Sequence, residues 1–102
     1  IKSDKLPISV ENLNILEDSL FKVVNAKYGT GGAAGGVPNI KIYGKTGSAE
    51  NHMGDKTHAW FAGFAKGENA DISFTIFMES AGHGGSVCAP LAKKIVEYYE
   101  KF

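Results

Sequence analysis

Residues 44–48, which read "GKTGS", contain two overlapping patterns that could do chemistry. The letters "GKT" match the end of a phosphate-binding loop, in which a lysine and backbone N–H groups hold nucleotide phosphates. The letters "KTGS" instead suit acyl transfer to a serine, which needs a cation, small hydroxyl donors for a substrate carboxylate and a backbone N–H directed at the developing oxyanion. Lys45, Thr46 and Ser48 could supply these groups. Gly47 would leave room for a substrate laid alongside the strand, where a β-carbon would clash.

The phosphate-loop interpretation fails on spacing and context. The pattern requires a glycine five positions before Gly44, where the chain has Asn39, and it requires a helix to begin at the lysine. Residues 47–54 ("GSAENHMG") instead predict a strand end and a turn. Residues 29–34 ("GTGGAA") match the dinucleotide fingerprint by letters, but they follow a helical segment rather than a strand, and Pro38 prevents a helix from following. We therefore expect no nucleotide cofactor.

Composition limits the class of protein further. The chain has 102 residues, 43% of them hydrophobic, which is enough for one small globular domain. Its 11 basic residues, all lysine, balance 11 acidic ones, so we expect no nucleic-acid partner. The single Cys88 excludes an internal disulfide, and His52, His58 and His83 lack the spacing of metal ligands, so no metal is expected. No apolar run reaches the roughly 20 residues of a membrane span, and the first residues do not read as a signal peptide. The protein is then either cytosolic or targeted by a segment outside this chain.

The hydrophobic pattern predicts an α+β fold in the order helix, three strands, helix. Ser9 can cap a first helix that ends near Asn25, and the glycine-rich residues 28–39 predict a loop. Residues 40–49, 58–66 and 71–79 predict strands, of which the middle one is apolar on both faces and should be central and covered on both sides. A last helix, from about residue 86 to 102, should cover one face of the sheet. The apolar stripe expected to do so comprises Leu91, Ile95, Tyr99 and Phe102.

The segments around Lys45 favour the acyl-transfer interpretation, because as a set they resemble a known family. "YGKTGSAE", "HAWFAGFA", the strand end "FMES", the loop "AGHGGSV" and the helix "CAPLAKKIVEYY" resemble the C-terminal part of the transpeptidase domain of class B penicillin-binding proteins. Upstream, "LFKVVNAKYGTGGAA" resembles the helix and loop that precede the third motif of that family. The resemblance implies that residues 1–102 are a single, incomplete domain. They would form the C-terminal portion of a β-lactamase/transpeptidase-like fold, with three antiparallel strands between an N-terminal and a C-terminal helix.

Only one of the family's three motifs is identifiable here. The first motif, S-x-x-K, supplies the acylated serine, the second is S-x-N, and the third is K-T-G on the sheet edge. The letters "SLFK", Ser19 to Lys22, match the first motif, but such a match is expected by chance in a chain with this many serines and lysines, and it lies in the helix before the glycine-rich loop. No S-x-N occurs. The resemblance therefore implies that the nucleophile lies outside this chain and that the chain alone is inactive.

The function implied by the resemblance is that of a peptidoglycan D,D-transpeptidase, which cross-links stem peptides by serine acyl transfer and is acylated by β-lactams. Lys45 would be the catalytic cation, Thr46 and Ser48 would bind the substrate carboxylate, the Ser48 N–H would be half of the oxyanion hole, and Gly47 would keep the strand edge open. Strict alternation puts Lys45 and Thr46 on opposite faces, so the site must lie at the sheet edge.

The resemblance also implies partners and a location. The N-terminal part of the same domain would pack against this chain, and the parent protein would be anchored in the bacterial cytoplasmic membrane with this domain on its outer, periplasmic or extracellular, face. Two alternatives remain open at this point. One is a serine β-lactamase or β-lactam sensor with the same fold, and the other is a non-catalytic interaction module that has lost the pocket.

Overall fold

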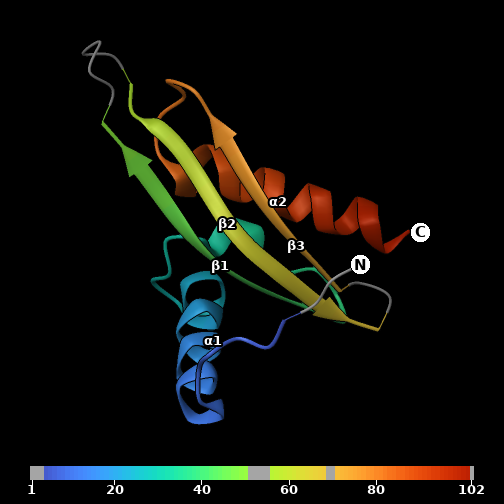
Figure 1. The fold of residues 1–102 in the computed structure, drawn as a ribbon. Coiled ribbons are helices and arrows are strands. Elements are labelled where there is room, and N and C mark those ends of the chain that lie inside the picture. Colours follow the sequence, from blue (N-terminus) through green and yellow to red (C-terminus); the bar gives the residue numbers. More distant parts are fainter. Residues whose placement is uncertain (1–3, 51–55, 69–70, 102) are drawn as a thin grey trace.

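The computed structural model describes residues 4–50, 56–68 and 71–101. Its elements follow the predicted order of helix, three strands and helix, with one short 3-10 turn in addition (Figure 1). The elements are α1 (Val10–Asn25), η1 (Gly32–Ala34), β1 (Ile40–Ala49), β2 (His58–Gly67), β3 (Asp71–Met78) and α2 (Gly84–Glu100).

The strands form one antiparallel sheet in the order β1-β2-β3, so β2 is central, as predicted. β1 and β2 pair without a bulge, from Ile40 opposite Gly67 to Ala49 opposite His58. Because side chains alternate along a strand, this register sorts every residue onto one of two faces. We call them the α2 face, which carries the Phe61 side chain, and the α1 face, which carries Trp60.

α2 closes the core on the α2 face with small side chains. Phe61 is fully buried at its centre. The prediction that Leu91, Ile95 and Tyr99 are buried is wrong, since they are 37%, 39% and 43% exposed. The fourth residue of the predicted stripe, Phe102, lies outside the described residues. The Phe61 ring already fills the space above the sheet, so α2 approaches with its small residues inward and turns its large ones outward. The buried residues of α2 are Gly84, Cys88, Ala89, Ala92 and Val96.

α1 begins at the predicted cap and lies beside the sheet. The Ser9 side chain accepts a hydrogen bond from the Asn12 N–H at 3.1 Å, which satisfies one of the free donors at the helix start. The first half of α1 projects beyond the sheet (Figure 1), and Val10 and Ile15 are exposed there. This part of the helix has an apolar face that the described residues leave uncovered.

The second half of α1 is fixed to the α1 face of the sheet by aromatic and polar contacts. The Phe21 ring lies 5.5 Å from that of Tyr43, which stacks on Phe64 at 4.6 Å. Glu17 accepts a hydrogen bond from Lys66 Nζ at 2.9 Å, which connects α1 to the central strand. These contacts hold α1 close to β1, the strand of interest for function.

The glycine-rich segment between α1 and β1 is more ordered than a loop prediction suggests. The prediction is wrong at Gly32–Ala34, which form one 3-10 turn. Ala34 and Val37 are buried in the core, so two apolar side chains anchor the segment. Its position beside α2 is therefore fixed by packing.

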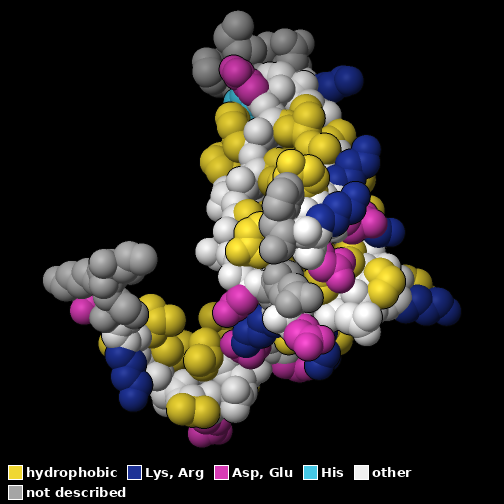
Figure 2. Space-filling model, turned by 90° about the vertical axis from the view of Figure 1, so that its right-hand side faces the viewer, with side chains coloured by type: hydrophobic (Ala, Val, Ile, Leu, Met, Phe, Trp, Pro, Cys, Tyr) yellow, Lys and Arg dark blue, Asp and Glu magenta, His cyan; other side chains and the backbone are white. Residues whose placement is uncertain are grey.

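Hydrophobic side chains also reach the surface. Figure 2, seen from the right-hand side of Figure 1, shows them among lysines and carboxylates. On the sheet, Trp60 and Phe77 are large exposed residues whose rings lie 4.5 Å apart on the α1 face. No described helix has the length and apolar composition needed to cross a bilayer.

Candidate active site

β1 carries a row of backbone groups along a free edge of the sheet. The Ile42 carbonyl accepts a hydrogen bond from Asn25 Nδ2 of α1 at 3.1 Å, so it points away from β2. In an antiparallel strand the N–H and C=O of one residue point to the same side, and the sides alternate. Thr46 and Ser48, at even spacing from Ile42, therefore direct their backbone groups outward as well. The expected edge position is confirmed, since β2 is the one neighbour of β1 among the described strands.

Lys45 brings a cation to this edge. Its side chain is exposed on the α1 face, and its Nζ donates to the Thr46 carbonyl at 2.9 Å. The ammonium group thus folds from one face toward the backbone row, which solves the problem that Lys45 and Thr46 point to opposite faces. Among the described residues no carboxylate pairs with Lys45. Leu20, Ala62 and Thr75 share with it the walls of an open depression of about 620 Å³.

Thr46 connects β1 to the glycine-rich segment. Its Oγ1 lies 2.8 Å from Thr30 Oγ1, within hydrogen-bond distance, with either hydroxyl able to donate. Thr30 was not predicted as a site residue. The sequence signal that could have found it is its place in a glycine-rich segment before the strand, where glycines permit close approach. Gly31 shows this approach, because a β-carbon there would lie 3.3 Å from Val23 Cγ1 and 3.4 Å from Phe61 Cε2.

Ser48, further along β1, connects this strand to the start of α2. Its Oγ accepts a hydrogen bond from the Gly84 N–H at 3.2 Å and lies 3.2 Å from His83 Nδ1. A β-carbon on Gly84 would lie 2.3 Å from the Trp60 carbonyl oxygen and 2.7 Å from that of Gly47. Only glycine allows this contact. α2 begins at Gly84, two residues before the predicted start. The prediction placed the start later because glycines in a sequence usually indicate a loop.

Comparison with known proteins identifies the family of the chain. The family model described as "Penicillin binding protein transpeptidase domain" matches residues 2–97. The chain belongs to this family.

Two groups of relatives of this transpeptidase-domain chain illustrate its extent. It is 37% identical over 94 residues to the peptidoglycan D,D-transpeptidase MrdA of Haemophilus influenzae. This match covers 78% of the chain and 14% of MrdA. It is 27% identical over 71 residues to the peptidoglycan D,D-transpeptidase PbpA of Mycobacterium tuberculosis, covering 62% of the chain and 14% of the relative. The chain therefore spans about one seventh of the length of these curated relatives.

Solved structures support the α+β fold of the transpeptidase domain. The crystal structure of Pseudomonas aeruginosa PBP2 in complex with WCK 5153 superimposes with a TM-score of 0.76 at 27% identity, over 95% of this chain and 21% of that one. The D,D-transpeptidase domain of a peptidoglycan glycosyltransferase from Eggerthella lenta gives a TM-score of 0.62 at 32% identity, over 79% of this chain and 18% of that one.

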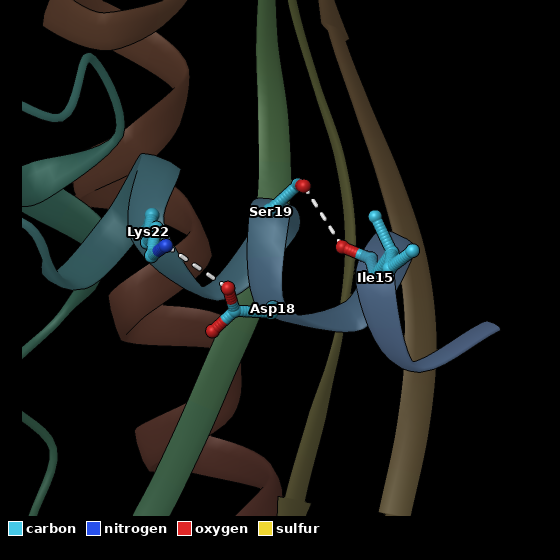
Figure 3. A network of polar contacts seen from close by, with 4 residues as sticks. All are labelled: Ile15, Asp18, Ser19 and Lys22. Carbon is cyan, nitrogen blue, oxygen red and sulfur yellow. Dashed lines mark hydrogen bonds and ion pairs between the residues drawn. The ribbon is translucent and has the colours of Figure 1, made fainter. Parts of the chain in front are cut away.

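The "SLFK" match does not form a paired serine and lysine in this transpeptidase-domain chain. Ser19 Oγ donates to the Ile15 carbonyl at 2.8 Å, and Lys22 Nζ pairs with Asp18 Oδ2 at 3.0 Å, as Figure 3 shows. Each side chain thus has a partner within its own helix. Activation of a serine requires a base within hydrogen-bond reach of its hydroxyl, and here the hydroxyl proton goes to a carbonyl instead.

The histidines separate into different roles. His58 Nδ1 accepts a hydrogen bond from the Ser80 N–H at 3.0 Å, which holds the end of β3 and makes it a structural residue. His83 contacts Ser48, a contact that the sequence did not indicate, because the two residues are 35 positions apart. His52 lies outside the described residues. Within the described part of the chain, no three histidine, cysteine or acidic side chains gather where a metal could bind.

Proposed function

We propose that this chain forms the β1 side of the active site of a peptidoglycan D,D-transpeptidase, which cross-links stem peptides by serine acyl transfer and is acylated by β-lactams. The observation that carries the proposal is the free edge of β1, where outward backbone groups, the Lys45 ammonium and two hydroxyls meet in a chain of this family. The names of the curated relatives, both peptidoglycan D,D-transpeptidases, support it.

The β1 edge suits binding of an extended peptide. A substrate backbone laid along it could pair with the outward groups of Thr46 and Ser48, which are two residues apart as a β-ladder requires. The Ser48 N–H would then donate to the oxygen of the carbonyl under attack and stabilise its developing charge. Gly47, between the two, adds no side chain on the α1 face, so the approach to Lys45 stays open.

The charge and hydroxyls at this edge suit an anionic group. Lys45 is not paired with a carboxylate of the described residues, so its charge remains available to a substrate carboxylate and to the reacting centre. Thr46 and Ser48 carry hydroxyls that could donate to the same carboxylate, as expected from the sequence. The Thr46 hydroxyl is 2.8 Å from Thr30 and that of Ser48 is held by α2, so both are already positioned by the fold.

We further propose that the nucleophile, on an S-x-x-K motif, and the S-x-N motif belong to another part of the same domain. That part would cover the apolar surfaces left open here, of which the Trp60–Phe77 pair and the first half of α1 are examples. The whole protein would act on the outer face of the bacterial cytoplasmic membrane, to which it would be anchored, because peptidoglycan is assembled there.

The test is acylation of the full-length protein by a labelled penicillin. Lys45→Ala should lower the acylation rate about a hundredfold, since loss of one well-placed electrostatic contact costs about 3 kcal/mol. Lys41→Ala is the matched control, because Lys41 is exposed on the same strand and the same face. Its rate should stay within about twofold of the parent, as for an exposed charge remote from the reacting centre.

Other outcomes lead to different functions. Rapid turnover of the penicillin would indicate a β-lactamase, and complete lack of acylation in the intact protein would indicate a non-catalytic module. Equal rates for the Lys45 and Lys41 variants would show that Lys45 is an ordinary surface lysine.

A further inference from the structure

The hydroxyl of Ser48 has a restricted choice of hydrogen-bond directions. A serine hydroxyl offers one donor hydrogen and two acceptor lone pairs. The Gly84 N–H, at 3.2 Å, can only donate, so it occupies one lone pair. His83 Nδ1, also at 3.2 Å, can donate or accept according to its tautomer. The direction of the Ser48 hydrogen is therefore decided by His83.

The two tautomers have opposite consequences for a ligand at the β1 edge. If Nδ1 carries no hydrogen, it accepts the hydrogen of Ser48, and the hydroxyl has nothing left to donate to a carboxylate. If Nδ1 carries a hydrogen, it donates to the second lone pair. Both lone pairs are then occupied, and the hydroxyl hydrogen must point away from α2, into the open space beside the strand.

The backbone of His83 is fixed, so the position of its imidazole relative to the Ser48 hydroxyl is fixed as well. Its carbonyl accepts hydrogen bonds from the N–H groups of Ser86 and Val87, each at 3.0 Å, so the residue is part of the first turn of α2. Its side chain makes no capping hydrogen bond to the helix. The imidazole is thus carried by a rigid element and left available to Ser48.

We propose that His83 is a positioning residue, whose Nδ1–H donates to Ser48 Oγ and thereby turns the Ser48 hydroxyl hydrogen toward the carboxylate of a bound substrate or β-lactam. This inference rests on the proposed function for the identity of the ligand. The contact between His83 and Ser48 itself does not depend on it.

The tautomer can be measured directly in the 102-residue chain. A long-range proton–nitrogen correlation spectrum at neutral pH distinguishes a ring nitrogen that carries hydrogen from one that does not. We expect Nδ1 of His83 to carry the hydrogen, and we expect this preference to disappear in Ser48→Ala. A bare Nδ1 in the unmodified chain, or an unchanged spectrum in Ser48→Ala, would overturn the inference.

The functional part uses two replacements of equal shape in the full-length protein. His83→Asn keeps an N–H donor at the distance of Nδ1 from the backbone, whereas His83→Leu has the same shape and no donor. We expect the leucine variant to be acylated by labelled penicillin about five- to tenfold more slowly, a typical net effect of losing one hydrogen bond. The asparagine variant should stay within about twofold of the parent.

A double-variant comparison separates positioning from packing. In a Ser48→Ala background, His83→Leu should have no further effect on the rate, because the hydroxyl that it positions is gone. An equal loss for the asparagine and leucine variants, or a leucine effect that persists without the Ser48 hydroxyl, would contradict the positioning role. If the intact protein is not acylated at all, the proposed function fails while the spectroscopic result still decides the His83–Ser48 contact.

Discussion

The ring of Phe61 lies so close to Gly44 that a β-carbon on this glycine would be 2.5 Å from Phe61 Cζ. The same ring comes within 3.0 Å of the position of a β-carbon on Gly63, the residue opposite Gly44 in the sheet. Gly47 differs, because its β-carbon would meet Trp60 Cβ at 3.3 Å, a contact that a small shift relieves. Packing therefore requires a glycine at position 44 but not at position 47, where we propose that the glycine gives a substrate access to the strand edge.

This difference predicts that a change to alanine has different effects at Gly44 and at Gly47. Gly44→Ala should overpack the core and lower the free energy of unfolding of the chain by about 1–3 kcal/mol. Gly47→Ala should change it by less than about 0.5 kcal/mol, yet should slow acylation of the full-length protein, because the added methyl stands beside the substrate edge. Thermal melting of the chain and penicillin acylation of the full-length protein measure the two effects. Melting of Gly47→Ala as low as that of Gly44→Ala would make Gly47 a packing residue.

A second prediction concerns Ser19. The chain alone should not form a covalent adduct with labelled penicillin, because Ser19 donates to a backbone carbonyl and Lys22 pairs with Asp18. In the full-length protein, Ser19→Ala should be acylated at the parental rate. Mass spectrometry of the labelled protein locates the adduct, and a penicilloyl group on Ser19 would show that "SLFK" is the true first motif.

A third prediction concerns the outer edge of β3. The alternation that begins at Ile42, carried across the paired registers, places the backbone N–H groups of Ser73 and Thr75 on that edge. Unpaired strand edges with apolar neighbours recruit other strands, so the isolated chain should self-associate as its concentration rises. Thr75→Pro removes one outward donor without breaking a bond to β2, and should reduce association.

The control for this edge is Thr75→Ala, which removes the side chain but keeps the N–H. Light scattering over a range of concentrations should show association for the alanine variant and less for the proline variant. If the unsubstituted 102-residue chain is monomeric at every concentration, the β3 edge does not recruit a partner.

A fourth prediction uses Cys88, which is fully buried between α2 and the sheet. Burial raises the pKa of the Cys88 thiol above its ordinary value of 9.0. A thiol reagent should therefore modify the native chain only as fast as the chain opens, and rapidly in denaturant. Above the ordinary pKa the unfolded chain releases the thiol proton while the folded chain retains it, so stability should fall as pH rises. Cys88→Ala should lack this additional fall, and immediate modification of the native chain would contradict the burial.

The sequence predicted the strands well because their signal is local. In β1 and β2, apolar and polar residues and flanking turns fix both the period and the ends, and β1 occupies residues 40–49 as expected. The inner face of α2 could not be predicted in this way. A helix period alone would bury Leu91, Ile95 and Tyr99, whereas small residues of α2 such as Ala92 are the ones that are buried, in the same core as Phe61.

Part of the candidate site has a local signal in the sequence, and part does not. Lys45 to Ser48 form a contiguous segment with a recognisable chemistry, and the structure places that segment at a sheet edge. Thr30 and His83 reach it from other segments, through contacts 16 and 35 residues apart in the chain. Such contacts depend on how glycine-rich segments pack against β1. The glycines around Thr30 signal that a close approach is permitted, but the sequence does not indicate which residues the approach brings together.

The contact between Ser48 and Gly84 has a consequence for the order in which the protein is made. These residues are 36 positions apart, so the contact between them can form only after β2, β3 and the start of α2 have been synthesised. When β1 has just emerged from the ribosome, residues 45–48 have therefore been synthesised, but their side chains are not yet in their final arrangement. Because domains are synthesised from the N-terminus, the carboxylate-binding hydroxyl proposed here is completed only when the last helix docks. A nascent chain that has not yet folded α2 therefore lacks the contact between Gly84 and Ser48 that holds the Ser48 hydroxyl in place.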